Sequence, residues 1–201
     1  MKRSASAILL VVALALALGA CATTGTPTPP SVTRAFDNPA ALTVPGEAAV
    51  TEGPASPYPS AIVVTDMPAS VTKVVVTLRA LSHSFPDDLD VLLVGPAGQH
   101  VLLMSDVGGS ADAVDLTLLL DAFAIGALPD ASPLQSGTFR PMNFGEPEDF
   151  PMPAPAGPYT TDLTVFGGTD PNGTWNLYVV DDEIGDIGAL AGGWSLSISA
   201  R

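Results

Sequence analysis

The chain has 201 residues, with 7 basic and 21 acidic side chains and a formal charge of −14 at pH 7. Phosphate binding depends on clustered Lys and Arg, so this charge argues against nucleic acid as a partner and favours cations. Hydrophobic residues make up 47% of the chain and charged residues only 14%, which excludes an acidic disordered polymer and indicates one domain with a large core.

The first twenty residues have the pattern of a secretion signal. Lys2 and Arg3 precede an apolar run from Ala5 to Leu18. This run is shorter than the roughly 20 residues that a membrane-spanning helix needs, so it indicates export and not a membrane span. Residues 1–20 are therefore predicted to be a signal peptide.

Cys21, the only cysteine, follows in Leu18-Gly19-Ala20-Cys21. This junction resembles a bacterial lipobox, which implies cleavage before Cys21 and attachment of lipid to its thiol. An unpaired thiol is otherwise unusual in an exported protein; an ordinary cleavage beside an incidental cysteine is the alternative. We therefore expect a bacterial lipoprotein held to a membrane through Cys21. Ala22 at the next position is compatible with transport to an outer membrane or the cell surface.

Residues 21–35 are rich in Thr, Pro and Gly and too poor in apolar residues to pack, so a tether is predicted there. The folded domain is expected over residues 36–201. Helix is not expected, because 20 prolines and 19 glycines interrupt most windows of helical length. Eight short β-branched runs alternate with breaks, at 41–44, 61–65, 73–78, 89–94, 100–105, 115–120, 174–180 and 194–199. This spacing predicts an all-β fold, a jelly-roll sandwich of about eight strands.

Aromatic residues suggest where the core and its cover lie. Trp175 and Trp194 each follow a glycine-containing turn in an alternating strand, so both are expected to be buried. The stretch from 128 to 159 has eight prolines and no period. We expect it to be an ordered but irregular excursion over one sheet face, held by Phe139, Phe144 and Phe150; a disordered loop is the alternative.

Hydrolytic chemistry has few candidate residues. The only imidazoles are His83 and His100, and the sequence around Ser105 is not a nucleophile elbow. We expect His83 to bond neighbouring backbone or hydroxyl groups and His100 to be exposed. Zinc would need a cluster of His and Cys, and no feature selects a carboxylate pair for glycoside hydrolysis. These motifs therefore predict no catalytic residue, and a stand-alone hydrolase ranks last among the functions considered.

Two carboxylate-rich strand ends are the strongest candidates for a site. In the segment 87–90 (DDLD), alternation along a strand would send Asp88 and Asp90 to one side. The segment 181–186 (DDEIGD) closes another strand, and its glycine would permit a bend. Calcium takes about six to eight oxygens from flexible loops. We therefore predict a calcium site formed by Asp88, Asp90, Asp181, Asp182 and Asp186, with solvated turn acids as the alternative.

Several motifs together resemble a known domain family. The segments are 82–93 (SHSFPDDLDVLL), 95–98 (GPAG), 103–106 (LMSD), 170–181 (DPNGTWNLYVVD) and 192–198 (GGWSLSI). They are similar to the P domain, also called P/Homo B, of subtilisin-like proprotein convertases, over about residues 36–199. The resemblance implies a jelly-roll sandwich. In the convertases this domain follows and stabilises a subtilisin catalytic domain, whose Asp, His and Ser segments are not found before residue 36.

We therefore expect a non-catalytic binding or stabilising module of a bacterial envelope. An accessory domain that acts in trans on a subtilisin-like serine protease is the alternative.

Overall fold

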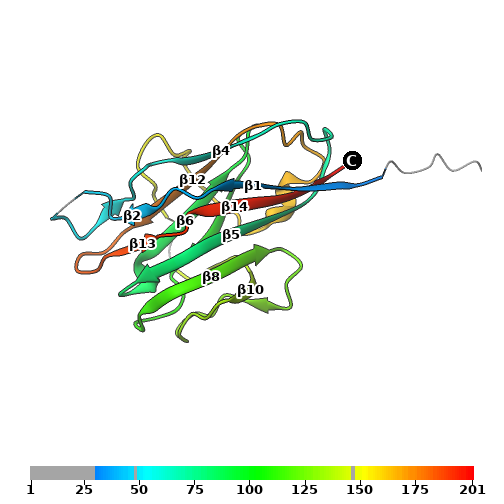
Figure 1. The fold of residues 1–201 in the computed structure, drawn as a ribbon. Coiled ribbons are helices and arrows are strands. Elements are labelled where there is room, and N and C mark those ends of the chain that lie inside the picture. The colour runs from blue at the N-terminus through cyan, green and yellow to red at the C-terminus, as the bar shows by residue number, and fades with distance from the viewer. Residues whose placement is uncertain (1–29, 48, 146–147) are drawn as a thin grey trace, which may run out of the picture.

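The computed structural model describes residues 30–47, 49–145 and 148–201. The predicted signal peptide, Cys21 and most of the predicted tether lie outside these residues. The described chain forms two β-sheets that face each other (Figure 1). Its helical content is two short 3-10 turns, η1 (Pro86–Asp88) and η2 (Leu163–Phe166). No helix among these residues is long and apolar enough to cross a membrane.

The first sheet has the strand order β1-β14-β5-β8-β10-β9, and β13 joins β2 to β5 beside it. Its long ladders are antiparallel, whereas β10 lies parallel to β8 and β9. The strands are β1 (Val32–Asn38), β2 (Leu42–Val44), β5 (Val71–His83), β8 (Ala113–Asp121), β9 (Gly126–Ala127), β10 (Gly137–Arg140), β13 (Gly188–Leu190) and β14 (Trp194–Ala200).

The second sheet has the order β11-β7-β6-β12-β3, with β4 also paired to β12. Its strands are β3 (Gly53–Pro54), β4 (Ser60–Val64), β6 (Leu89–Val94), β7 (His100–Ser105), β11 (Met142–Asn143) and β12 (Gly173–Asp181). All eight predicted runs coincide with strands, so the predicted all-β sandwich is confirmed. β1 was not predicted: it starts before Phe36 and pairs with β14 from Val32 onward, so the ordered domain includes part of the predicted tether.

Alternation along the strands sends one set of apolar side chains into the space between the sheets. Trp175 and Trp194 lie there with no exposed surface, as predicted. Each indole N–H is satisfied: Trp175 donates to the Pro171 carbonyl (2.8 Å) and Trp194 to the Ser60 hydroxyl (2.9 Å). Burial of a polar N–H with a partner costs far less than burial without one.

A second apolar cluster lies on the outer face of the second sheet. It contains Leu92, Val94, Leu102, Phe150, Tyr178 and Val180. The part of the excursion that follows β11, the edge strand of the second sheet, covers this cluster with Phe150, Ala154 and Tyr159. Tyr58 and Tyr159 pack against it from the sides. The expected ordered cover over one sheet face is therefore present.

Two of the three phenylalanines expected to hold the excursion do so. Phe150 is buried in the outer cluster, and Phe139 packs against the main core. The expectation for Phe144 is wrong, because this side chain is 44% exposed. The Gly145 N–H donates to the Asn143 side-chain oxygen (2.9 Å), and this Asx turn directs the intervening Phe144 outward.

The sandwich has two distinct ends. At the proximal end, β1 begins at Val32, opposite Ala200, and Ala200 is also opposite Val71 at the start of β5. β8 finishes at this end, and η2 lies against it through a hydrogen bond from the Gly168 N–H to the Val71 carbonyl (2.8 Å). The distal end is formed by the last residues of β5 and β12 and by the first residues of β6, where Asp181 lies opposite Leu89.

Candidate metal centre

Burial of β6 on both faces positions the first acidic side chain of the site. Leu89, Val91 and Leu93 point into the main core. Asp90 is the register partner of Val180, a member of the outer cluster, so its carboxylate lies on the outer face of the second sheet. The excursion closes over this face and leaves Asp90 only 5% exposed. A carboxylate is rarely buried to this extent without a partner.

Three carboxylates converge at this point. Oxygen atoms of Asp90, Glu148 and Asp182 all lie within 4.8 Å of one another. They come from three parts of the fold: β6, the excursion, and the residue that follows β12. The backbone fixes two of these parts together, because the Asp182 N–H donates to the Asp88 carbonyl (3.1 Å). The two predicted acidic segments therefore lie at the same end of the sandwich.

Oxygen acceptors outnumber donors around these carboxylates. The buried Ser105 hydroxyl lies 2.9 Å from Asp106 Oδ2, 3.2 Å from Asn143 Oδ1 and 3.0 Å from Glu148 Oε1. One hydroxyl proton can serve only one of these three acceptors. The ion pairs between described residues are Lys73–Asp121, Arg79–Asp37 and His83–Asp181, so none supplies a lysine or arginine to the cluster.

The absence of a β-carbon at position 145 brings Asp106 against the excursion. A β-carbon on Gly145 would collide with the Asp106 carboxylate. Asp106 itself has a left-handed backbone, with φ of 49°. Asp106 adds a further carboxylate beside Ser105 and Glu148.

The electrostatics of the cluster disfavour several negative charges at once. Burial, followed by repulsion from Glu148, raises the pKa of Asp90. Burial also raises the pKa of Glu148. Burial together with Glu148 and Asp106 raises the pKa of Asp182 to about 6. A divalent cation would remove this repulsion and let all three groups ionise.

The other predicted ligands have different surroundings. Strand alternation turns Asp181 inward, where its Oδ2 lies 3.1 Å from His83 Nε2, with both side chains fully buried. Asp186 accepts a hydrogen bond from the Ser84 hydroxyl (2.6 Å). Asp88 lies outside the converging trio, and burial with repulsion from Asp181 raises its pKa to about 7.

Of the five predicted ligands, only Asp90 and Asp182 belong to the converging trio of described residues. The third member, Glu148, was missed as a ligand.

Both histidine rings make hydrogen bonds within the fold. His83 Nδ1 lies 2.8 Å from the Phe85 carbonyl, which agrees with the expected bond to neighbouring backbone, and the Asp181 contact was not anticipated. His100 is partly covered, because Tyr159 packs edge-on against it at 5.5 Å between ring centroids. Its Nδ1 lies 3.1 Å from the Gly98 carbonyl. Full exposure of His100 was therefore the wrong expectation.

A cleft of about 490 Å³ opens beside the three carboxylates. Glu148 and Asn143 form its acidic and amide wall, while Leu102, Pro158 and Tyr159 supply an apolar and aromatic wall. A concave surface with a few convergent polar groups is the usual form of a ligand site. Glu148 belongs to both the cleft and the trio of carboxylates.

No protein-family description matches the chain, and no curated protein matches it. Among solved structures, the chain is similar to a serine protease of Aeromonas sobria, with a TM-score of 0.44 and 17% identity over 89% of this chain. It is also similar to the complex of Aeromonas sobria serine protease with the chaperone ORF2, with a TM-score of 0.44 and 17% identity over 88% of this chain. In both structures this chain spans 28% of the matched chain.

Proposed function

We propose that the chain is a non-catalytic, lipid-anchored binding module of a bacterial envelope, stabilised by calcium at its distal end. The observation that carries the proposal is the convergence of Asp90, Glu148 and Asp182 beside an open cleft. The sequence resemblance to the P domain accords with a module that binds or stabilises another protein.

Calcium fits the donor set better than other common metals. The converging side chains offer carboxylate oxygens, with the Asn143 amide oxygen and the Asp106 carboxylate close by. Hard oxygen donors select calcium, magnesium or manganese, whereas zinc favours nitrogen and sulfur. Ligands drawn from a strand, an excursion and a loop suit the flexible coordination of calcium better than the tight octahedron of magnesium.

The surroundings of the imidazoles support a non-catalytic role. Each hydrogen bond of His83 and His100 in the described chain goes to a backbone group or to Asp181, and none goes to a serine hydroxyl. Ser105, the serine nearest the cleft, is surrounded by oxygen acceptors. The described residues therefore do not form the Ser–His pair of serine hydrolases.

Affinity capture tests the binding role. The mature chain is used to capture partners from envelope extracts, with calcium and with chelator. We expect one protein to be captured only with calcium, by the wild type and by the exposed control Asp112→Asn. The Asp90→Asn variant should capture at least tenfold less, since a tenfold change corresponds to about 1.4 kcal/mol.

Capture that is unchanged by chelator and by Asp90→Asn would overturn the calcium-dependent role. A subtilisin-like protease as the captured protein would establish the alternative function, an accessory acting in trans. Hydrolysis of peptide or ester substrates by the purified chain would refute the non-catalytic role.

The anchor is tested separately at Cys21. The Cys21→Ser variant should lose the mass of the acyl groups and be found as unprocessed precursor or as a soluble product, because a hydroxyl cannot take the place of the modified thiol. Mass spectrometry and detergent partitioning of the mature chain measure both effects, with Asp112→Asn as a processed control. An unchanged mass and partition for Cys21→Ser would show that the cysteine is incidental.

A further inference from the structure

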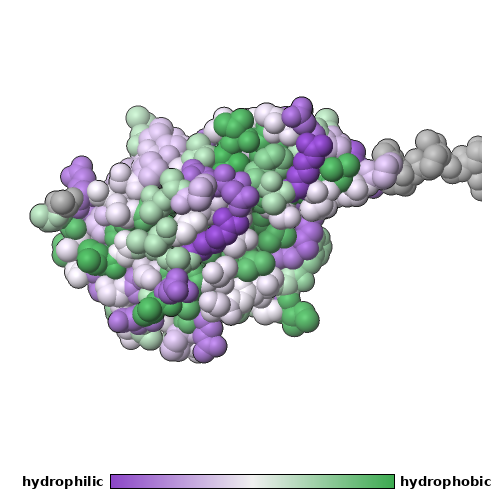
Figure 2. Space-filling model, viewed as in Figure 1, coloured by the Kyte–Doolittle hydropathy of each residue, from purple (hydrophilic) through white to green (hydrophobic). Residues whose placement is uncertain are grey.

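The proximal end presents apolar side chains to solvent. Ile125 is 101% exposed and Phe123 is 66% exposed, both in the turn between β8 and β9, and Val165 on η2 is 38% exposed. Figure 2 shows hydrophobic residues, in green, at the end of the molecule where β1 begins. Exposure of single apolar residues is common and does not by itself indicate a binding face. The conformation of the turn that carries them is therefore informative.

The turn that carries Phe123 and Ile125 is fixed by hydrogen bonds. Arg140 Nη1 donates to the carbonyls of Ala124 and Ile125, each at 2.7 Å. Asp121 accepts hydrogen bonds from the N–H groups of Phe123 and Ala124, both at 3.0 Å. The turn is therefore held in a shape that leaves the side chains of Phe123 and Ile125 largely exposed.

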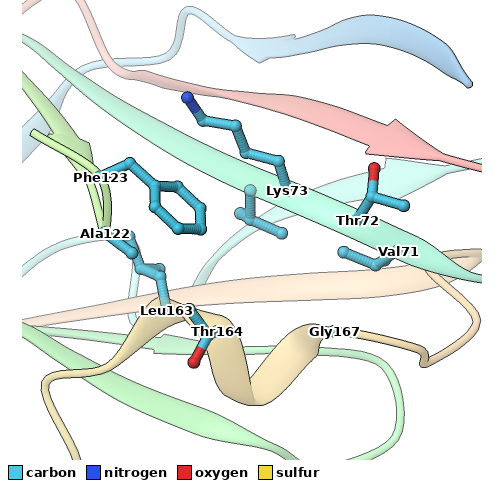
Figure 3. A pocket seen from close by; sticks show the side chains of 9 residues that line it. Val71, Thr72, Lys73, Ala122, Phe123, Leu163, Thr164 and Gly167 are labelled. Carbon is cyan, nitrogen blue, oxygen red and sulfur yellow. The ribbon is translucent and has the colours of Figure 1, made fainter.

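The same end has a shallow apolar pocket of about 140 Å³ (Figure 3). Figure 3 shows Phe123 and Lys73 beside each other, with Leu163 of η2 nearby. The Lys73 ammonium lies 5.7 Å from the Phe123 ring centroid and forms an ion pair with Asp121 (2.7 Å). An aliphatic stem on an apolar surface with its charge at the rim is typical of residues at a membrane interface.

Charge distinguishes the two ends. The acids near the proximal end, Asp66, Asp121, Asp162 and Asp170, are balanced by Arg34, Lys73, Arg140 and Arg201. The distal end carries the acidic cluster without a lysine or arginine ion pair among the described residues. Exposed Ile184 and Ile187 lie there among Asp182, Glu183 and Asp186, so an anionic lipid surface would repel that end.

The covalent path also leads to the proximal end. From Cys21 to Val32 the chain can span at most about 40 Å, even when fully extended. β1 and the turn after β8 are separated by β14 and β5, which at about 4.8 Å per strand places the turn about 14 Å from β1. A bilayer that holds Cys21 is therefore within reach of Phe123 and Ile125.

We propose that Phe123 and Ile125 insert into the lipid surface and hold the sandwich with its proximal end on the bilayer. This inference rests on the proposed lipid anchor for the nearness of the membrane. The occupant is a bilayer, because the face is apolar, has as many basic as acidic side chains and lies at the end through which the proposed anchor enters. The acidic distal end and its cleft then face away from the membrane.

Fluorescence quenching by brominated lipids tests the insertion. The variants Phe123→Trp, Ile125→Trp and the distal control Val114→Trp, whose parent side chain is 68% exposed, are reconstituted as full acylated chains. The vesicles contain phosphatidylethanolamine and phosphatidylglycerol with brominated acyl chains. Trp175 and Trp194 have no exposed surface and give a constant background in the wild type.

We expect the added tryptophan emission of Phe123→Trp and Ile125→Trp to shift to shorter wavelength and to be strongly quenched. The Val114→Trp emission should match that in unbrominated vesicles. Equal quenching of the three variants, or none at positions 123 and 125, would overturn the inference. A shift to shorter wavelength that appears only when envelope proteins are added would also overturn it, by assigning the face to a protein partner.

Mass analysis of the same samples separates this inference from the anchor. An acylated Cys21 without quenching at positions 123 and 125 refutes the orientation and leaves the anchor intact. If Cys21 carries no lipid, the same variants are added to preformed vesicles. Quenching confined to positions 123 and 125 then supports insertion of this face, although the lipid anchor has been refuted. Absence of quenching at these positions refutes the insertion as well as the anchor.

Discussion

Calcium is expected to raise the melting temperature of the wild-type protein by about 5–10 °C relative to the same protein with chelator. At a hundredfold excess over Kd, an ion that binds only the folded state adds about 2.7 kcal/mol to the free energy of unfolding. For a domain of this size each kcal/mol corresponds to roughly 2–4 °C. Magnesium should have a much smaller effect. An unchanged melting temperature with chelator would refute the metal centre.

The pH dependence of the same comparison follows from the carboxyl pKa values. Without metal, the folded-state pKa is raised to about 7 for Asp88 and to about 6 for Asp182. The folded state therefore binds more protons than the unfolded state between about pH 4 and pH 7, so its free energy of unfolding falls as pH rises through that window. Calcium binds the ionised form, so the difference between calcium and chelator should be small at pH 5 and large at pH 8.

The Asp90→Asn variant is expected to be more stable than the wild type without calcium and less stabilised by calcium. It removes a buried carboxyl whose ionised form is disfavoured, so the chelated variant should melt at or above the chelated wild type at pH 8. It also replaces a charged ligand by a neutral amide, so calcium should raise its melting temperature much less than that of the wild type. Asp112→Asn should keep the wild-type calcium response. A full calcium response in Asp90→Asn would remove this residue from the site.

The Trp175→Ala variant is expected to lose about 3–5 kcal/mol of unfolding free energy, as large truncations of buried aromatics do. Trp175 is fully buried, and its ring lies 4.8 Å from that of Phe166. The loss also leaves the Pro171 carbonyl without its indole donor. Urea unfolding measures the effect, which is a large part of the typical 5–15 kcal/mol stability of a domain.

Two further variants show how much of that loss comes from the buried ring and how much from the N–H donor. Trp175→Phe keeps an aromatic ring but not the N–H donor, so it should lose less than Trp175→Ala. Val63→Ala, on β4 opposite Thr174 and 64% exposed, should change the stability by no more than about 0.5 kcal/mol. A Trp175→Ala loss as small as that of Val63→Ala would show that the ring is not part of a packed core.

The strands that were predicted form continuous or alternating apolar runs, and the missed ones form neither. β1 is an edge strand in which Val32 to Ala35 are exposed, so its sequence is not distinguishable from that of a tether. β3, β9, β10, β11 and β13 have two to four residues each, too few for a period to show. Their pairing depends on neighbours that are distant in sequence.

The candidate site was predictable where acids are dense along the chain. Asp90 and Asp182 belong to such segments, whereas Glu148 comes from an excursion without a period and reaches Asp90 only through the tertiary fold. The inward position of Asp181 could have been predicted: it continues the alternation of Leu177 and Val179, both in the main core. That alternation separates Asp181 from Asp182 and directs it toward His83.

The pairing of β1 has a mechanical consequence. β1 is held in its sheet by β14 alone, through a ladder from Val32–Ala200 to Asn38–Trp194. A pull between an anchor that precedes Val32 and a partner at the distal end acts along the length of these strands. It therefore loads the hydrogen bonds of the ladder together, in shear, and does not peel them apart one pair at a time. Resistance to such a pull is set by the rate at which the whole β1–β14 ladder slips, so with the proposed anchor in place β1 would be the strand that bears the load.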